Sequence, residues 1–266
     1  MEKVLLNSLP KAGTNLIAKA LDLLGFYPAF SLDPGLFLRD KWQNRVRRFL
    51  NRPRKQGYII GINHPIEISR GSVERILQKT QKGQYITAHI GFSEDILSRA
   101  LELDFKTIQM IRDPRAVAAS YVPYVAKNIN NPFHKEFSQK SKNEQYQIAF
   151  KGYQGKNISK QSLYTSCLAL EPWINSKETL VIKFEDIVGE KGGGDDTIQK
   201  EVLTELASRI GAPKDKIDYV VENIFGSGRH TFRKGKIDSW KDEIPKNIQK
   251  TMTEELEPIL RKWNYI

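Results

Sequence analysis

Short, continuous apolar runs alternate with helix-forming stretches along most of this chain, and this alternation limits the fold more than any other feature. Four runs stand out, at residues 3–9, 58–63, 106–112 and 179–184, with 84–90 as a fifth candidate. Such runs are typical of parallel strands buried on both faces. The pattern between them predicts helices at residues 14–24, 94–103, 115–127, 160–175, 197–210 and 246–263. We therefore predict an α/β fold with a central, mostly parallel sheet flanked by helices.

The length and cysteine usage bound the organisation of the chain. A chain of 266 residues with 39% hydrophobic residues can bury a sizeable core, and we expect one domain over residues 1–266. The first apolar stretch runs straight into a loop, so we expect neither a signal peptide nor a membrane span there. The single cysteine, Cys167, excludes an internal disulfide framework and fits a reducing compartment. We therefore expect a cytoplasmic protein.

The stretch LPKAGTN, residues 9–15, joins the first predicted strand to the first predicted helix. This arrangement aims backbone N–H groups and the positive end of a helix dipole at an anion. Gly13 permits close backbone approach, and Lys11 adds a full positive charge. Thr14 and Asn15 add side-chain donors. The stretch lacks the glycine and lysine spacing of the nucleotide-triphosphatase loop, which disfavours a triphosphate with magnesium. It predicts a phosphate-type site, although a surface turn would also explain seven residues taken alone.

Two later segments place basic side chains where an anion could bind. In IRDPRAVAASYVPY the strand delivers Arg112 to the carboxyl edge of the sheet, and Ser120 follows about two helical turns later. Arginine offers a planar fork of donors for a phosphate, and a hydroxyl can complete the shell. In FRKGKIDSWKDE, Arg233 and Lys234 precede Gly235 and form another candidate anion site. Taken singly, a surface Arg–Asp pair or a solvated basic loop explains these segments as well.

Taken together and in this order, the three segments resemble the sulfotransferases that use 3′-phosphoadenosine 5′-phosphosulfate (PAPS). In that family a loop close to PKSGT holds the 5′-phosphosulfate, an arginine and a later serine hold the 3′-phosphate, and a third motif is close to RKGxxGDWKN. The resemblance runs from residue 3 to about residue 241 and implies the P-loop-NTPase-like sulfotransferase fold. The "FED" at residues 184–186 resembles the family's segment near the adenine. The implied donor-binding residues are Lys11, Ala12, Gly13, Thr14, Asn15, Arg112, Ser120, Phe184, Arg233, Lys234 and Gly235.

The sequence departs from the family pattern in three places. Leu16 stands where cytosolic members often carry a tryptophan against the adenine, so stacking must be weaker or come from Phe184 or Phe225. The third motif keeps Trp240 and Lys241 but lacks the usual glycine and asparagine. The carboxyl-terminal motif through which many cytosolic members dimerise is not recognisable, so no oligomeric state is predicted.

The resemblance also implies catalytic roles for Lys11 and His89. Lys11, beside the 5′-phosphate, is suited to neutralise the charge that grows there during in-line transfer. His89 occupies the place of the family's catalytic histidine, and a histidine of near-neutral pKa is an effective general base. Two alternatives stay open: a strand-end histidine that is merely hydrogen-bonded, and Glu67, close to His64, as the base. Thr87 stands where the family often places a second lysine, and no cysteine or histidine cluster has metal spacing.

The formal charge of +11 favours an anionic partner. Residues 39–55 hold eight basic residues and one acidic residue. They could contact an acidic acceptor, a membrane surface or nucleic acid, but a solvated basic helix is the simpler interpretation. Residues 121–160 lack clear periodicity, and we hypothesise that they form a mobile lid over the acceptor pocket.

The expected reaction is sulfuryl transfer to a hydroxyl or amine of a small-molecule, lipid or glycan acceptor, with no metal and no nucleic-acid partner. Two functions other than sulfuryl transfer are alternatives at the level of the sequence. A nucleotide or small-molecule kinase on a related fold needs a triphosphate loop and magnesium carboxylates, neither of which the sequence places. A basic nucleic-acid-binding protein is the other rival, and its affinity would fall steeply with salt.

Overall fold

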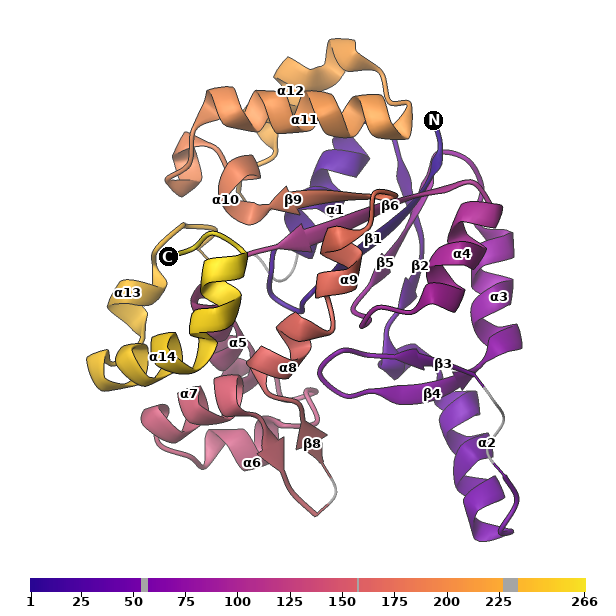
Figure 1. Ribbon diagram of the computed structural model, residues 1–266, viewed down its shortest axis with the longest axis vertical. Helices are drawn as coiled ribbons and strands as arrows, with labels where there is room; N and C mark the ends of the chain where they lie inside the picture. The colour runs from indigo at the N-terminus through magenta and orange to yellow at the C-terminus, as the bar shows by residue number, and fades with distance from the viewer. Residues whose placement is uncertain (54–56, 157, 227–233) are drawn as a thin grey trace.

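Five parallel strands form the central sheet of the protein in a computed structural model, which describes residues 1–53, 57–156, 158–226 and 234–266 (Figure 1). The order across the sheet is β2-β5-β1-β6-β9. The bounds are Lys3–Ser8 (β1), Tyr27–Leu32 (β2), Gln84–Ala88 (β5), Phe105–Ile111 (β6) and Thr179–Lys183 (β9). Each neighbouring pair in this order is parallel. The predicted central parallel sheet is confirmed.

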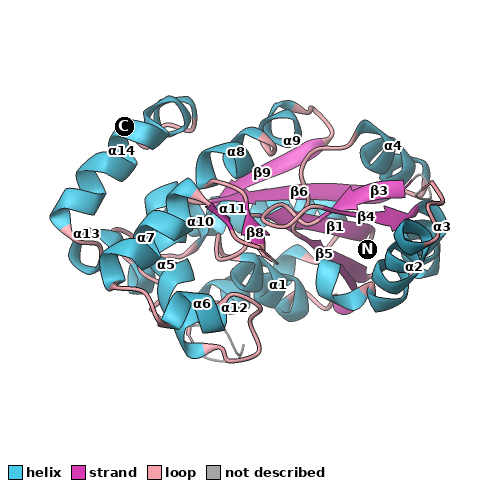
Figure 2. Cartoon of the chain, turned by 90° about the horizontal axis from the view of Figure 1, so that it is seen from below, coloured by secondary structure: helices cyan, strands magenta, loops and turns pink. Residues whose placement is uncertain are grey.

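Helices pack on both faces of the sheet because alternate side chains of each strand point in opposite directions. In β1, Val4 and Leu6 enter one buried cluster and Leu5 enters the other. The first face is covered by α1 (Thr14–Leu23), α11 (Asp196–Ile210) and α12 (Ile217–Asn223). The second is covered by α3 (Arg70–Lys79), α4 (Glu94–Glu102), α8 (Leu163–Leu168) and α9 (Glu171–Asn175). Figure 2 shows the strands as a central layer with helices around it.

Further helices lie beside the carboxyl ends of the strands. Those that pack together there are α5 (Pro114–Lys127), α6 (His134–Ser138), α7 (Lys142–Lys151) and α14 (Lys246–Lys262) (Figure 1). Two one-turn helices, α10 (Phe184–Ile187) and α13 (Trp240–Glu243), belong to the connections. The second buried cluster continues into this group of helices, so the core extends past the edge of the sheet.

Two strand predictions differ from the structure. The run at residues 58–63 forms β3 (Gly57–Ile60), which pairs antiparallel with β4 (Ile66–Ser69) as a separate two-stranded sheet. The connection between β3 and β4 is too short for the crossover that a parallel partner requires. The position at the sheet's edge belongs instead to β2, which the sequence did not reveal. Pro28 lies inside this strand and several of its side chains are exposed, so its sequence lacks the signal of a buried central strand.

Two other predictions also need correction. The helix predicted over residues 160–175 is divided into α8 and α9, and Pro172 occupies the first turn of α9, where its missing N–H costs no helical bond. Residues 121–160 are not irregular, since they contain α6, α7 and a short antiparallel pair, β7 (Tyr153–Gln154) with β8 (Ser159–Lys160). Buried aromatic side chains such as Phe137 and Phe150 anchor these short elements, which are too brief to show a clear period. Their mobility stays a hypothesis.

The basic stretch at residues 39–55 is mostly helical. Helix α2 (Leu38–Phe49) projects from the body of the protein beside the β3–β4 hairpin (Figure 1). A helical conformation was expected for this stretch. Within the described ranges, none of the helices has both the length and the apolar character needed to cross a bilayer.

Candidate active site

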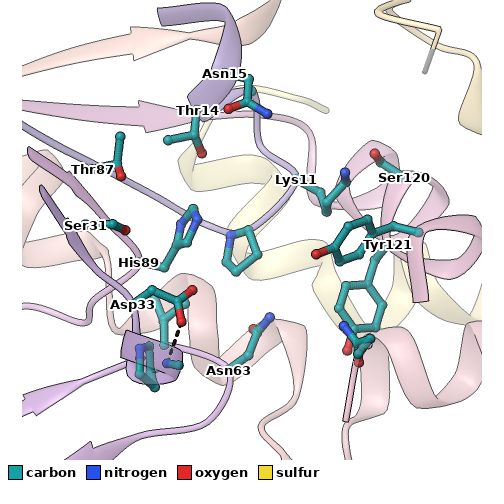
Figure 3. Close-up of a pocket in the computed structure, with 18 of the residues that line it drawn as sticks. Lys11, Thr14, Asn15, Ser31, Asp33, Asn63, Thr87, His89, Ser120 and Tyr121 are labelled. Carbon is teal, nitrogen blue, oxygen red and sulfur yellow. Dashed lines mark hydrogen bonds between the residues drawn. The ribbon is translucent and has the colours of Figure 1, made fainter. Parts of the chain in front are cut away.

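One large cavity lies at the carboxyl ends of the parallel strands, and all five strands contribute to its wall. Each strand supplies a residue at or just beyond its end, and these residues are Lys11, Asp33, His89, Arg112 and Phe184. Carboxyl ends of parallel strands meet at one edge of a sheet, which is the usual position of ligand sites in such folds. The cavity has a volume of about 1330 Å³. Figure 3 shows His89, Thr87, Ser31 and Asp33 on one side of it, with Lys11, Ser120 and Tyr121 on the other.

The loop after β1 is held in an unusual conformation against the sheet. Lys11 has φ 74° and Gly13 has φ 108°, and Gly13 is the N-cap of α1. A Cβ atom at Gly13 would lie 2.5 Å from the Met110 Cε and 2.7 Å from the Phe184 ring. Only glycine fits this contact. The absence of a side-chain cap at Gly13 leaves the first backbone N–H groups of the helix, which border the cavity, suited to an anion.

The remaining residues of this loop divide into two groups. Thr14 and Asn15 line the cavity together with Lys11. The hydroxyl oxygens of Thr14 and Ser8 lie 2.6 Å apart, which ties the first turn of α1 to the end of β1. Ala12 is buried and is not part of the cavity wall, and its N–H donates to the Leu9 carbonyl at 3.1 Å.

Arg112 lies in the cavity wall, between the loop after β1 and the loop before α13. Its guanidinium carbon lies 3.9 Å from the centroid of the Phe184 ring, and its Nη2 donates to the Lys236 carbonyl at 3.1 Å. The neighbouring Asp113 instead forms a buried ion pair with Arg115 at 2.8 Å. The sequence left open a surface ion pair between Arg112 and Asp113. In the structure Asp113 pairs with Arg115 instead, and Arg112 lines the cavity together with Ser120.

The third basic segment reaches the cavity only in part. Lys234 and Gly235 line the cavity, whereas Arg233 lies outside the described residues. Trp240 is buried, with the Arg115 guanidinium 4.2 Å from its ring centroid. Lys241 forms an exposed ion pair with Asp238 at 2.6 Å and is not in the cavity wall. The described part of this segment therefore offers Lys234 and the Gly235 backbone to a ligand.

An apolar region adjoins Arg112 in the same cavity. Its walls are aromatic and aliphatic side chains from α1, from α10 and its end, and from the end of α12: Leu16, Phe184, Val188, Ile224 and Phe225. Such a surface can take the flat face of a base, next to cationic groups that can take a phosphate. Phe184 and Phe225 both line this region, and their stacking on the adenine in place of the missing tryptophan stays a prediction.

His89 follows β5 and is oriented by the backbone of β1. Its Nδ1 lies 2.9 Å from the Ser8 carbonyl oxygen. A carbonyl can only accept, so Nδ1 carries the proton and Nε2 carries the lone pair of the neutral ring. Nε2 makes no hydrogen bond within the described part of the chain. Burial lowers the pKa of His89, while the hydrogen bond to Ser8 and the charge of Asp33 oppose that effect.

A buried amide holds the segment that carries His89. The Asn7 Nδ2 donates to the Ile90 carbonyl at 2.9 Å, and its Oδ1 accepts the Ile90 N–H at 3.0 Å. The same Nδ2 also donates to the Gln109 side chain at 2.9 Å. Asn7 thereby joins β1 to the residue after His89 and to β6. It is a positioning residue that the sequence did not single out, because only the sheet register brings these positions together.

Glu67, the competing base, and its neighbour His64 lie in different surroundings. Glu67, on β4, accepts the Gly57 N–H at 3.1 Å and is not in the cavity wall. His64 lines the cavity, where its ring stacks on Phe133 with centroids 4.8 Å apart. Its Nδ1 is hydrogen-bonded to the Ser159 carbonyl, and burial lowers the pKa of His64 as well. Of the two candidate bases, His89 lies in the cavity wall and Glu67 does not, and His64 lines the same cavity.

Several cavity residues were not predicted from the sequence. Tyr121 lines the cavity opposite His89, with Asn63 below (Figure 3), and Tyr124 and Phe133 line the same cavity. The Lys11 Nζ lies 4.3 Å from the Tyr124 ring centroid. Burial raises the pKa of Tyr121, so its phenol stays a hydrogen-bond donor at neutral pH. Tyr121 directly follows Ser120 in the chain, and this adjacency was the one sequence feature that could have indicated a place for Tyr121 in the cavity.

No group of three or more His, Cys, Asp or Glu side chains that could hold a metal ion occurs among the described residues. The polar groups that line the cavity include Lys11, Arg112, the Thr14 and Ser120 hydroxyls and the His89 ring. The expectation of a metal-free site stays a prediction.

Comparisons with known proteins point to one family. A family model described as "Sulfotransferase domain" matches residues 1–264. No curated protein sequence matches the chain.

Among solved structures, mouse sulfotransferase SULT7A1 complexed with PAP is similar in fold, with a TM-score of 0.61 at 17% identity. The match covers 98% of this chain and 85% of that one. Retinol dehydratase in complex with androsterone and inactive cofactor PAP has a TM-score of 0.57 at 14% identity, covering 97% and 80%. A retinol complex of retinol dehydratase scores 0.52 at 15% identity, covering 97% and 81%. At these identities the likeness shows the fold.

Proposed function

The chain belongs to the sulfotransferase domain family, and we propose that it transfers a sulfuryl group from PAPS to a hydroxyl group carried by an apolar or aromatic small molecule. The family match confirms the resemblance found in the sequence and decides against the kinase and nucleic-acid-binding alternatives. The cytoplasmic location and the single-domain organisation stay predictions.

The single observation that supports the donor is the meeting of three sequence segments in one cavity. Lys11, Arg112 and Lys234 come from positions far apart in the chain and line the same wall. The uncapped start of α1 and Lys11 would hold the 5′-phosphosulfate, whereas Arg112 and Ser120 would hold the 3′-phosphate. Solved relatives of the same fold carry PAP, the product that this donor leaves. The two anionic groups of the donor would meet cationic side chains in a cavity that also has an apolar wall for the base.

Two side chains would assist the transfer itself. His89 Nε2 takes the proton of the acceptor hydroxyl as that oxygen bonds to sulfur and the bond from sulfur to the phosphate oxygen breaks. Lys11 stabilises the negative charge left on that phosphate oxygen, an effect typically of about 3–4 kcal/mol for one positioned donor. PAPS supplies the activated sulfuryl group when bound. The neutral state of His89 that this role needs is the state that burial favours.

The acceptor side of the cavity supports a hydroxyl on an apolar body. Phe30, Ile62, Ile76 and Phe133 supply apolar surface there, together with polar side chains that include Asn63 and Ser31. Pockets that combine large apolar surfaces with placed polar groups suit ligands with an apolar body and a polar group. The related structures hold retinol or androsterone, both small apolar molecules with hydroxyl groups. An alcohol or phenol with an apolar scaffold therefore fits better than a free sugar.

Thermal-shift measurements test the donor. Adenosine 3′,5′-bisphosphate (PAP) should stabilise the protein more than AMP, ATP or a short oligonucleotide, because only PAP presents phosphates to both cationic regions. An equal response to ATP would contradict the proposed donor. The acceptor is tested separately with labelled PAPS and a panel of apolar alcohols, phenols and sugars. Transfer to sugars alone would contradict the proposed acceptor class and leave the donor assignment standing.

A further inference from the structure

Helix α2 turns large apolar side chains toward solvent. Leu38, Trp42 and Phe49 have exposed fractions of 70%, 65% and 88%. Their spacing of four and seven residues places them along one stripe of the helix. Leu50, which follows the helix, is also half exposed. Soluble proteins expose single apolar side chains freely, but a continuous stripe of this kind usually marks an interaction site.

The opposite face of α2 is polar and is bonded to the protein. Asp40 is buried, and its carboxylate accepts the Ser69 N–H at 3.2 Å and the Ser72 hydroxyl at 2.9 Å. The Asn44 Nδ2 donates to the Glu67 carbonyl at 3.0 Å. These hydrogen bonds fix the rotation of the helix about its axis. The outward direction of the apolar stripe is therefore a consequence of specific bonds and not of loose attachment.

Basic side chains border the apolar stripe. Lys41, Arg45 and Arg48 are exposed and follow one side of it at helical spacing. In the described ranges of the chain, none of these three forms an ion pair. Their charges are therefore available to an external anion. The outward surface of α2 thus combines apolar side chains, a tryptophan and a row of cations.

We propose that this surface, formed by Leu38, Trp42 and Phe49 with Lys41, Arg45 and Arg48, binds to bilayers that contain anionic lipids. A helix lying in the membrane interface needs an apolar face that enters the headgroup region and cations that meet anionic headgroups. Tryptophan favours that region in particular. Nucleic acid would use the cations but not the apolar stripe, and a second copy of this surface would bring like charges together. Charge complementarity therefore favours the membrane.

This orientation also sets the position of the cavity. Leu36 and Lys41 line the cavity, and they lie at the start of α2 beside the apolar stripe. Docking through α2 would place this side of the cavity near the lipid surface. An apolar alcohol dissolved in the bilayer could then enter without crossing water. This last step rests on the proposed function, but the binding of α2 to lipid does not.

Vesicle binding of the full chain tests the proposal. Trp42 is the only exposed one of four tryptophans, all of which are described, so a blue shift of tryptophan fluorescence reports its burial. We expect co-sedimentation and a blue shift with phosphatidylcholine vesicles that contain phosphatidylserine, weakening as salt is added. Leu38→Glu/Phe49→Glu should reduce the partition coefficient about a hundredfold. Both side chains are exposed, and circular dichroism and the thermal midpoint check that the variant is folded.

Two variants that lose the same charge test whether the cations of α2 in particular, and not the net charge of the protein, attract it to anionic lipids. Arg45→Ala/Arg48→Ala should weaken binding about tenfold. Lys177→Ala/Lys250→Ala removes the same charge from exposed sites on other elements and should leave binding unchanged. Failure of the protein to bind the anionic vesicles would overturn the proposal. So would binding that ignores Leu38 and Phe49, or a dimer in solution that Leu38→Glu/Phe49→Glu dissociates.

Discussion

The Nδ1 of His89, the residue directly after β5, lies 2.9 Å from the carbonyl oxygen of Ser8, the last residue of the neighbouring strand β1. This contact selects the tautomer in which Nε2 is the basic nitrogen. Ser8 also places its hydroxyl 2.6 Å from that of Thr14, at the start of α1. One residue at the end of β1 thus orients the candidate base and the first turn of the donor-binding helix. Ser8 therefore links the orientation of His89 to the position of the first turn of α1.

Replacing His89 should separate catalysis from donor binding. In His89→Gln we expect kcat to fall by about 10²–10⁴-fold, because a general base is lost. The affinity for PAP should change little, since His89 lies across the cavity from Ser120 (Figure 3). The matched control is Glu67→Gln, which removes the competing base outside the cavity and should retain turnover. Full activity in His89→Gln would assign the base elsewhere.

The pH profile of the reaction should report the same group. His89 acts as a base only when neutral, and burial lowers its pKa below the ordinary value of 6.5. Activity should therefore be at its plateau at neutral pH, with kcat/KM falling as the pH drops through that lowered pKa. The acid limb should disappear in His89→Gln. A limb centred clearly above 6.5 would show that another group controls the rate.

Arg112 should determine the preference for a 3′-phosphate. We expect Arg112→Ala to weaken PAP binding by about 10- to 100-fold, the loss typical of hydrogen bonds to a charged group. AMP lacks the 3′-phosphate, so its affinity should fall much less. Lys241→Ala is the control, because Lys241 belongs to the same family motif as Lys234 but pairs with Asp238 outside the cavity. Calorimetric titration of PAP and AMP against each variant measures the ratio.

The donor side of the site could be predicted because its signals are local in sequence. The helix expected at residues 14–24 is found at Thr14–Leu23, and the loop before it carries Lys11 and Gly13 where the pattern placed them. Parallel strands then gather the ends of β1 and β6 at one edge without further information. The pairing of Asp113 with Arg115 was not predictable, since it depends on how α5 packs.

The acceptor side could not be predicted for the opposite reason. Asp33 follows an edge strand that contains Pro28, which weakens the strand signal, and Asn63 lies in the turn of a separate hairpin. Phe133 reaches the cavity from a connection before a five-residue helix. None of these positions has a periodic signal. Their convergence follows from long-range packing, which a single sequence does not encode in any short window.

Gly13 should be intolerant of a side chain. In Gly13→Ala the added Cβ would meet Met110 and Phe184, and the φ of 108° is unfavourable for any residue but glycine. We expect a loss of about 1–3 kcal/mol in the free energy of unfolding, together with weaker PAP binding. Gly71→Ala is the control, because Gly71 lies in α3 with no heavy atom within 4 Å of its would-be Cβ. Urea unfolding should show that variant unchanged or up to about 1 kcal/mol more stable.

Lys160 should make stability depend on pH in a direction opposite to that of a paired lysine. Its Nζ is buried and donates to the Ala149 and Gln161 carbonyls at 2.8 and 3.0 Å. Burial lowers the pKa of Lys160 to about 8, against 10.5 for an ordinary lysine. Between these values the unfolded chain binds more protons than the folded one, so stability from this group rises with pH.

The test compares the free energy of unfolding of the protein with that of Lys160→Met across the same pH values. Relative to the variant, the unchanged protein should gain up to about 3 kcal/mol as the pH rises from about 8 toward 10.5. Groups distant from Lys160 are common to both proteins and cancel in the difference, whereas Cys167 interacts with Lys160 and has a pKa that burial raises. Lys177→Met, at an exposed position, should show no such trend. Parallel curves for the protein and Lys160→Met would mean that Lys160 keeps an ordinary pKa in the folded state.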